Sequence, residues 1–365
     1  MKVGPAVCAP AVRRLFQAAD IVIDGDRPWD VRVLDSRFYC VVLRQGSLGF
    51  GETYMQKWWS TDDVEEVVYR LIRVGLDRAV RILPARIAAV VVGVVTNQQT
   101  PVRSMAVAER HYNLGNDLFF ALLGKYRNYS CAYFDGTDSL DRAQVLKMDL
   151  ICRKLKLDES DHLLDVGGGW GHLAHYAATR YGCRITSINI SDEQIRYARN
   201  LCRGLPVDVQ KCDYREVTGT YTKVAAIAVL THVGPKNYRP FMRIMHNCLT
   251  DDGLMLIESI GSRFPNTTGD PWFRKYIFPG GVIPSIGQFM SAIAGLLTPI
   301  ELVEWGNHYV PTLQAWHANL LAAWPTLNAR YSETTRLMME YYLLASAAAF
   351  RAGRLKYWHL SLAKC

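Results

Sequence analysis

Short apolar runs alternate with helical stretches through the middle of this 365-residue chain. Five runs predict buried strands, since each is a short block of mainly apolar residues that ends before a helical pattern begins. They are HLLDVG, CRITSINI, VDVQKCD, VAAIAVL and GLMLIESIG, between residues 162 and 261. Strands that alternate with helices favour a parallel sheet with helices on both faces. The pattern therefore predicts an α/β fold.

The flanking regions have other patterns. RRLFQAADIVI (13–23) has helical spacing, DVRVLDSRFYCVVLR (30–44) alternates as strands do, and residues 64–95 are helical in spacing. The polar segment Thr96–Ser104 contains a proline and predicts a linker. We therefore predict a smaller N-terminal α+β domain over residues 1–97, with a lipid-binding or accessory role, and a second domain over residues 98–365. From about Ser262 onward the chain is expected to be helical and rich in aromatic residues.

The charge balance indicates an anionic partner. Lys and Arg total 42 against 34 for Asp and Glu, a net charge of +8, which suits nucleic acid, a phospholipid surface or an acidic metabolite. Arginines recur along one flank of the helical segment that starts at residue 64: Arg70, Arg73, Arg78, Arg81 and Arg86. This flank would meet an anionic bilayer surface, or it is simply a solvated helix face.

Three features predict a cytoplasmic protein. The longest apolar run, Ile87–Val95, is too short to span a bilayer. The first residues lack the apolar region and cleavage site of a signal peptide. The nine cysteines contain no C-x-x-C pair, so a metal site is not expected and the cysteines are predicted to be reduced thiols.

The turn DVGGGWG (165–171) follows the first predicted strand. Glycines let a backbone approach a ligand closely, and the N-terminus of the next helix points at that ligand. The spacing departs from the dinucleotide pattern G-x-G-x-x-G, and Trp170 would crowd a pyrophosphate. A nucleotide-like ligand without a phosphate is therefore favoured, over a dinucleotide or a tight junction that binds nothing.

The turn resembles motif I of class I S-adenosylmethionine methyltransferases, with Asp165 closing the strand. Asn189 and Gln194 follow the second strand, where a ribose would lie, and Asp213 ends the third, where an adenine contact is usual. The predicted cofactor-binding residues are Tyr129, Ser130, Asp165, Gly167, Gly168, Gly169, Gly171, Asn189, Gln194 and Asp213.

Over nearly its whole length the chain resembles the cyclopropane-fatty-acyl-phospholipid synthase family. The motifs that carry the resemblance are LRQGSLGFGETYMQKWW, ERHYNLGNDLFFALL, YSCAYF, DVGGGWGHLAHYAA, THVGPKNY, DPWFRKYIFPGG and YYLLASAAAFRAG. The resemblance implies a Rossmann-like class I methyltransferase sheet with a helical lid. It implies methyl transfer from S-adenosylmethionine to a cis double bond of a phospholipid acyl chain, followed by ring closure, at the inner membrane surface. It also allows a homodimer.

The predicted base site departs from this family. The family reads Glu-His-Val-Gly at residues 231–234 and His-Thr-Ile-Gly at residues 258–261, where this chain has Thr231 and Glu258. In the family, that Glu and His help to hold a bicarbonate ion that serves as the base. The Tyr matching Tyr309 and the backbone at the positions of Cys131 and Ile260 complete that site.

Three alternatives follow. Glu258 and Thr231 keep a bicarbonate; or the Glu258 carboxylate is itself the base, with a pKa raised by an apolar pocket; or deprotonation is altered. In this third alternative the product is methyl-branched or carries a methylene group, or the enzyme acts on a non-phospholipid alkene. Aromatic and oxygen-bearing groups would stabilise a carbocation, and Tyr129 is one candidate. The predicted catalytic residues are Glu258, Thr231, His232, Tyr309, Cys131 and Ile260.

Parts of the sequence also suit two other classes of function. A nucleic-acid methyltransferase would suit the positive charge, but VLTHVG stands where N-methylating enzymes have a D/N-P-P-Y motif, and no groove of alternating basic and aromatic residues is evident. No nucleic-acid partner is therefore predicted. A non-catalytic lipid-binding relic is the other alternative, prompted by the rebuilt base site.

Overall fold

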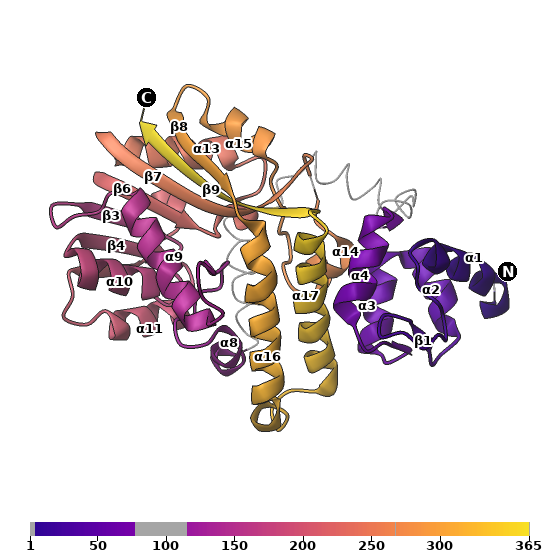
Figure 1. Cartoon of the computed structure of the whole chain (residues 1–365). Coiled ribbons are helices and arrows are strands. Elements are labelled where there is room, and N and C mark those ends of the chain that lie inside the picture. Colours follow the sequence, from indigo (N-terminus) through magenta and orange to yellow (C-terminus); the bar gives the residue numbers. More distant parts are fainter. Residues whose placement is uncertain (1–3, 77–114, 267, 365) are drawn as a thin grey trace. The chain divides into compact units, whose positions relative to one another are not determined.

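The computed structural model describes residues 4–76, 115–266 and 268–364, which form two compact units (Figure 1). The first unit comprises the described parts of 1–96 together with 268–279 and 313–354, and the second comprises the remainder. The predicted boundary after residue 97, the predicted linker, the run Ile87–Val95 and the last three arginines of the basic flank all lie outside the described residues.

The second unit is built on a seven-stranded sheet with the order β5-β4-β3-β6-β7-β9-β8. Five parallel strands form most of it: β3 (His162–Val166), β4 (Arg184–Asn189), β5 (Val207–Lys211), β6 (Tyr221–Ile227) and β7 (Leu249–Ser262). All five predicted strands are present, and the predicted α/β fold is confirmed. β9 (Leu355–Lys364) runs antiparallel between β7 and β8 (Leu297–Glu304).

Both faces of the parallel sheet are buried, which explains why its strands are continuous apolar runs. Neighbouring residues on a strand point to opposite faces: Leu163 packs with α9 (Leu140–Lys154) and α10 (His172–Tyr181), whereas Leu164 packs with α13 (Tyr238–Cys248). The other helices among the described residues of this unit are α8 (Asn116–Leu123), α11 (Asp192–Leu201), α12 (Leu230–Val233) and α15 (Ile286–Ile293), with the short 3₁₀ turns η1 (Tyr214–Glu216) and η2 (Gly306–His308).

The first unit is mostly helical. In its described residues the elements are α1 (Pro5–Ala18), α2 (Arg37–Gln45), α3 (Ser47–Met55), α4 (Val64–Arg73), α14 (Pro271–Tyr276) and α17 (Glu333–Arg351), with the short antiparallel pair β1 (Arg32–Val33) and β2 (Trp59–Ser60). α16 (Tyr309–Leu327) begins in the second unit and continues in the first.

Two element predictions are wrong. The segment predicted as strands before residue 45 is chiefly the helix α2, because helical spacing lets Phe38 pack against Phe16 and Phe50. The C-terminal third is not wholly helical, since β8 and β9 complete the sheet. In both cases tertiary packing overrides the local pattern.

The aromatic segment DPWFRKYIF, part of a motif that carries the family resemblance, belongs to the first unit. Trp272 is completely buried there and its ring lies 4.6 Å from the ring of Tyr341. A Cβ added to Gly51 would come within 2.5 Å of the indole. This close packing makes the segment a structural part of the first unit.

The prediction that all cysteines are reduced thiols is wrong for one pair. Cys8 on α1 and Cys40 on α2 form a disulfide, with their Cα atoms 5.3 Å apart. The packing of α1 against α2 brings together two residues that are 32 positions apart, which sequence spacing does not reveal. Six other described cysteines are free: Cys131, Cys152, Cys183, Cys202, Cys212 and Cys248.

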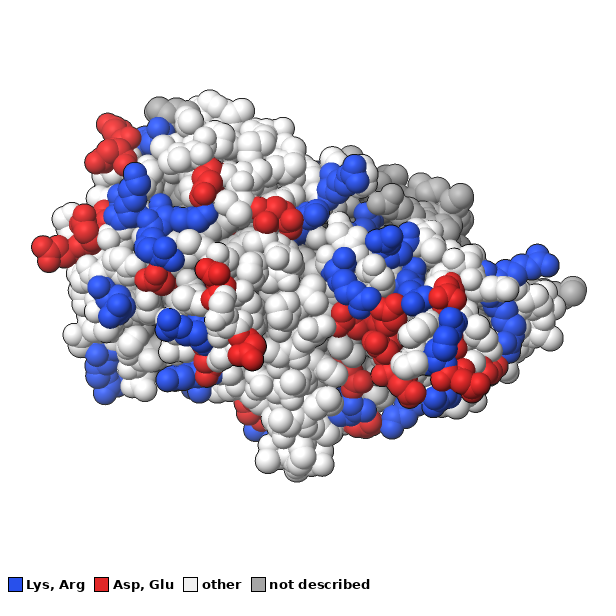
Figure 2. Space-filling view, in the orientation of Figure 1, with Lys and Arg blue, Asp and Glu red and all other residues white. Residues whose placement is uncertain are grey.

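The basic flank is less positive at its start than predicted. Arg70 pairs with Asp20 at 2.5 Å and with Glu66 at 2.6 Å, and it lies over the ring of Trp29. On the face shown in Figure 2, charges of both signs are interspersed. In the parts of the chain that the structure describes, no helix has the length and apolar character needed to cross a membrane.

Candidate active site

The glycine turn joins β3 to α10 and is tied to the neighbouring strand. The backbone N–H groups of Gly167 and Gly168 both donate to the carbonyl of Ile188, at 2.9 and 3.1 Å. Gly171 precedes α10 with a φ of 84°, in the left-handed region that favours glycine. The turn therefore has a fixed shape at the carboxyl end of β3.

Three of the four glycines are required by packing within the protein. A Cβ on Gly168 would lie 2.0 Å from the hydroxyl oxygen of Ser187. A Cβ on Gly171 would lie 2.8 Å from Ala198, and one on Gly167 would lie 2.8 Å from a methyl group of Val229. These positions need glycine whether or not a ligand is bound.

Gly169 differs from the other three. Its φ is 56°, and a Cβ built on it would have no neighbouring atom within 4 Å. The backbone is thus in a glycine conformation next to open space, which is the arrangement a closely approaching ligand needs. The turn fits the predicted cofactor at this residue.

Asp165 lies beneath the turn and is buried. Burial raises its pKa to about 6, while a hydrogen bond donated by the Ser187 hydroxyl at 3.0 Å acts in the opposite direction. The residues predicted to contact the ribose and the adenine form hydrogen bonds and an ion pair within the protein. Asn189 donates to the carbonyl of Gly169 and to the Gln194 side chain, and Asp213 pairs with Arg215 at 2.8 Å.

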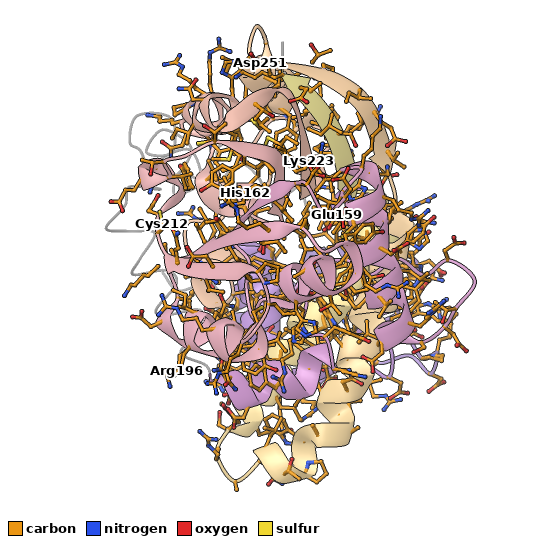
Figure 3. The ribbon with its side chains drawn as sticks, turned by 90° about the vertical axis from the view of Figure 1, so that its left-hand side faces the viewer. Glu159, His162, Arg196, Cys212, Lys223 and Asp251 are labelled. Atoms are coloured by element: carbon orange, nitrogen blue, oxygen red, sulfur yellow. A yellow bond between two sulfur atoms is a disulfide. The ribbon has the colours of Figure 1, made fainter. Side chains whose placement is uncertain are left out.

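A buried polar cluster lies at the same end of the sheet. Glu258 on β7 is paired in register with Ile227, the last residue of β6. Figure 3 labels His162 and Lys223, which lie near the starts of the adjacent strands β3 and β6, at the opposite end. The cluster and the glycine turn therefore share the carboxyl ends of the parallel strands, where ligands bind in open α/β sheets.

The Glu258 carboxylate has two partners on β9. Tyr357 donates its hydroxyl to Oε2 at 2.8 Å, and His359 Nε2 lies 2.5 Å from Oε1. Glu258 and Tyr357 are 0% exposed and His359 is 1% exposed. The triad is thus almost completely shielded from water.

The expectation that an apolar pocket raises the pKa of Glu258 is wrong. Burial alone would raise it, but the imidazole of His359, the ammonium of Lys147 and the Tyr357 hydroxyl outweigh burial and leave the pKa below its ordinary value. The immediate surroundings of the carboxylate are polar rather than apolar. Glu258 is therefore a carboxylate at neutral pH.

Two further groups complete the cluster. Lys147 on α9 is buried and donates to the Ser130 hydroxyl at 2.7 Å, and burial lowers its pKa. The Cys131 thiol has a pKa raised well above its ordinary value, first by burial and then by the negative charge of Glu258. Cys131 is consequently a neutral thiol.

The loop that carries Cys131 is held by the segment that begins α16. The N–H of Ala132 donates to the Thr312 hydroxyl and the N–H of Phe134 donates to His308 Nδ1, both at 3.1 Å. The rings of Tyr309 and Tyr357 lie edge to face, 5.2 Å apart. The predicted residues Cys131, Tyr309 and Glu258 are thereby brought together.

Three other predicted residues take no part in the two hydrogen bonds that hold the Glu258 carboxylate. Thr231 and His232 are on α12, and the Thr231 carbonyl accepts a hydrogen bond from the N–H of Val282. The hydrogen bonds to the Glu258 carboxylate come from β9 and not from Thr231. Ile260 on β7 is paired in register with Tyr357.

Sequence reasoning missed Tyr357, His359 and Lys147. A signal for the first two existed, because KYWHLSLAK alternates as a strand does and places Tyr357 and His359 on one face. Their partner could not be identified without the pairing of β9 with β7. For Lys147 there was no signal, since a lysine on an amphipathic helix is normally exposed.

The mainly parallel sheet and the open glycine turn after an acid-terminated first strand define a class I methyltransferase fold. Residues 99–360 match the family model described as mycolic acid cyclopropane synthetase. The chain therefore belongs to this family of S-adenosylmethionine-dependent methyltransferases.

Individual relatives agree. The chain is 37% identical over 354 residues to the cyclopropane-fatty-acyl-phospholipid synthase of Escherichia coli K12, covering 95% of this chain and 91% of the relative. It is 31% identical over 350 residues to the tuberculostearic acid methyltransferase UfaA1 of Mycobacterium tuberculosis, covering 87% and 79%. The solved structure of the cyclopropane synthase MmaA2 from Mycobacterium tuberculosis has a TM-score of 0.67 and 26% identity, covering 73% of this chain and 100% of that one.

Proposed function

We propose that this protein transfers a methyl group from S-adenosylmethionine to the cis double bond of an unsaturated acyl chain in a phospholipid. The transferred carbon and the two carbons of the former double bond then form a cyclopropane ring. The observation that carries the proposal is the similarity to the Escherichia coli synthase over 95% of this chain. The geometry supports it, because a turn open at Gly169 and a buried, charged cluster lie at one end of one sheet.

The residues at the turn suit the proposed cofactor. The mycolic acid cyclopropane synthase CmaA1 was solved with SAH, at 28% identity and a TM-score of 0.67, covering 71% of this chain and 98% of that one. Here Gly169 would lie against the cofactor, with Asp165 below it and Asn189 holding the turn in shape. When bound, S-adenosylmethionine supplies a methyl group on a positively charged sulfur.

The protein's own groups meet the other needs of this chemistry. An alkene is a weak nucleophile, so the double bond must be held close to the methyl group in a site without water. Attack leaves a carbocation on the acyl chain, which aromatic faces such as those of Tyr309 and Tyr129 stabilise. A base must then remove a proton so that the ring can close.

The test is lipid analysis after expression in a bacterium that lacks its own synthase. We expect monounsaturated phospholipid chains to gain one CH₂ unit and to lose their olefinic signals, because the double bond becomes a ring. Mass spectrometry and proton NMR of the extracted lipids measure both changes. Unchanged lipids from cells that contain the folded protein would contradict the proposed function.

One relative gives a second candidate product. The name of UfaA1, tuberculostearic acid methyltransferase, supports a methyl or methylene branch as the alternative outcome. The same experiment separates the two products. A methylene branch also adds one CH₂ unit, but it keeps an olefinic signal, whereas a cyclopropane ring does not.

We further propose that the protein works in the cytoplasm, peripherally at the inner membrane surface, since its proposed substrate lies in a bilayer. The overall charge of +8 would favour anionic lipid. In vesicle sedimentation we expect binding to anionic vesicles that weakens as salt increases, because exposed charges are screened. Arg70→Gln should change this little, since two carboxylates already neutralise Arg70. Binding that is insensitive to both salt and lipid charge would contradict an electrostatic contact.

A further inference from the structure

We propose that this protein carries its base within its own chain: the Glu258 carboxylate, positioned by Tyr357 and His359, replaces a bound bicarbonate ion. This inference rests on the proposed function, since the base is needed only if a ring is closed. It deepens that function by assigning the proton acceptor and two positioning residues.

The residues present do not fit a bicarbonate ion. The family site uses a His at position 258, which can donate to an anion, whereas Glu258 is an ionised acceptor. Both of its oxygens already have hydrogen-bond partners, Tyr357 and His359, and neither partner is left to donate to a second anion. A second anion beside it would be repelled with little screening by water.

The negative charge of Glu258 affects the pKa values of two neighbouring groups, Cys131 and Tyr357. Beyond the effect of burial, the negative charge of Glu258 raises the pKa of the Cys131 thiol and of the Tyr357 hydroxyl, both well above their ordinary values. Each would become an anion on losing its proton, and the charge of Glu258 opposes this. The same field opposes an added bicarbonate.

The imidazole missing from position 258 is present on the neighbouring strand. β9 pairs with β7 so that His359 lies opposite Glu258, with its ring 2.5 Å from the carboxylate. His359 Nδ1 is buried without a hydrogen-bond partner among the described residues. With a proton on Nε2, the ring donates a hydrogen bond to Glu258 and holds the carboxylate in place.

These contacts keep Glu258 ionised, which the reaction requires. A C–H bond next to a carbocation is strongly acidic, so even a weak carboxylate base can accept its proton. The C–H bond of the transferred methyl group breaks, and its electron pair forms the C–C bond that closes the ring. The proton passes to Glu258, which becomes a neutral carboxylic acid.

The test uses the purified, full-length protein with vesicles of monounsaturated phospholipid and S-adenosylmethionine, in buffer freed of carbon dioxide. We expect the rate of ring formation to stay within about twofold when bicarbonate is then added in millimolar amounts. A rate that rises steeply with bicarbonate would overturn the inference. No turnover with or without bicarbonate would instead contradict the proposed function.

Chemical rescue provides a second measurement. Glu258→Ala should open a cavity beside Tyr357 and His359, into which added formate or bicarbonate can bind. We expect calorimetry to detect formate binding to this variant but not to the wild type, and formate to restore part of the turnover. Failure of formate to bind a folded Glu258→Ala variant would count against the inference. If the variant does not fold, the wild-type bicarbonate titration decides.

Tyr357→Phe tests the positioning role. The carboxylate loses one donor that lowers its pKa, so the acid limb of the pH–rate profile should move to higher pH. We expect kcat to fall by about tenfold with little change in KM for S-adenosylmethionine. An unmoved pH profile would mean that Tyr357 does not position the base.

Discussion

Replacing Glu258 with Gln should lower the rate of ring formation by a factor on the order of 10² to 10⁴, the loss expected when a general base is removed. Gln has nearly the same shape and can still accept a hydrogen bond from Tyr357, but its amide cannot take up a proton at neutral pH. Methyl transfer and ring closure need different groups, so the first step should be less affected than the second.

The measurement follows both products of the reaction. Release of S-adenosylhomocysteine reports methyl transfer, and mass spectrometry of the lipid reports ring closure. Glu301→Gln is the matched control, since Glu301 lies on β8 in an exposed ion pair with Lys154 and should keep wild-type activity. Full ring formation by a folded Glu258→Gln variant would show that Glu258 is not the base.

Gly169→Val should weaken the binding of S-adenosylmethionine by roughly 100-fold or more, a loss on the order of 3 kcal/mol. A branched side chain here would fill the open space beside the turn, which the cofactor is proposed to occupy. The backbone also has a φ of 56°, which costs a non-glycine residue about 1–2 kcal/mol. Calorimetric titration with S-adenosylmethionine measures the effect.

Gly204→Val separates these two contributions. Gly204 also has a positive φ, of 83°, and a Cβ there would meet nothing within 4 Å, but it belongs to the loop before β5 and not to the turn. Both variants should lose similar stability in thermal unfolding, whereas only Gly169→Val should lose cofactor binding. Equal affinity in the two variants would mean that the turn does not line the cofactor.

The central strands could be predicted because each is buried on both faces. Such strands must be short apolar runs whatever surrounds them, and the glycine turn after β3 marks the ligand-binding edge. The alternation of strand and helix then restricts the order of connections. This local information was enough for the α/β fold and for the class of cofactor.

Other elements could not be predicted in this way. Residues 37–45 have a pattern that suits either a strand or a helix, and the packing of Phe38 against Phe16 and Phe50 selects the helix α2. The disulfide between Cys8 and Cys40 likewise depends on how α1 lies against α2. In each case the deciding contact joins residues that are distant in sequence.

The candidate base site shows the same division. The sequence by itself determined that a carboxylate, Glu258, stands where the family has a His. Only the tertiary structure decided the state of that carboxylate, because Tyr357 and His359 lie about 100 residues away along the chain and reach it through the pairing of β9 with β7. Burial alone predicts a raised pKa, and these distant partners reverse its direction. The pKa of a buried group depends on its spatial neighbours, which an isolated sequence motif does not contain.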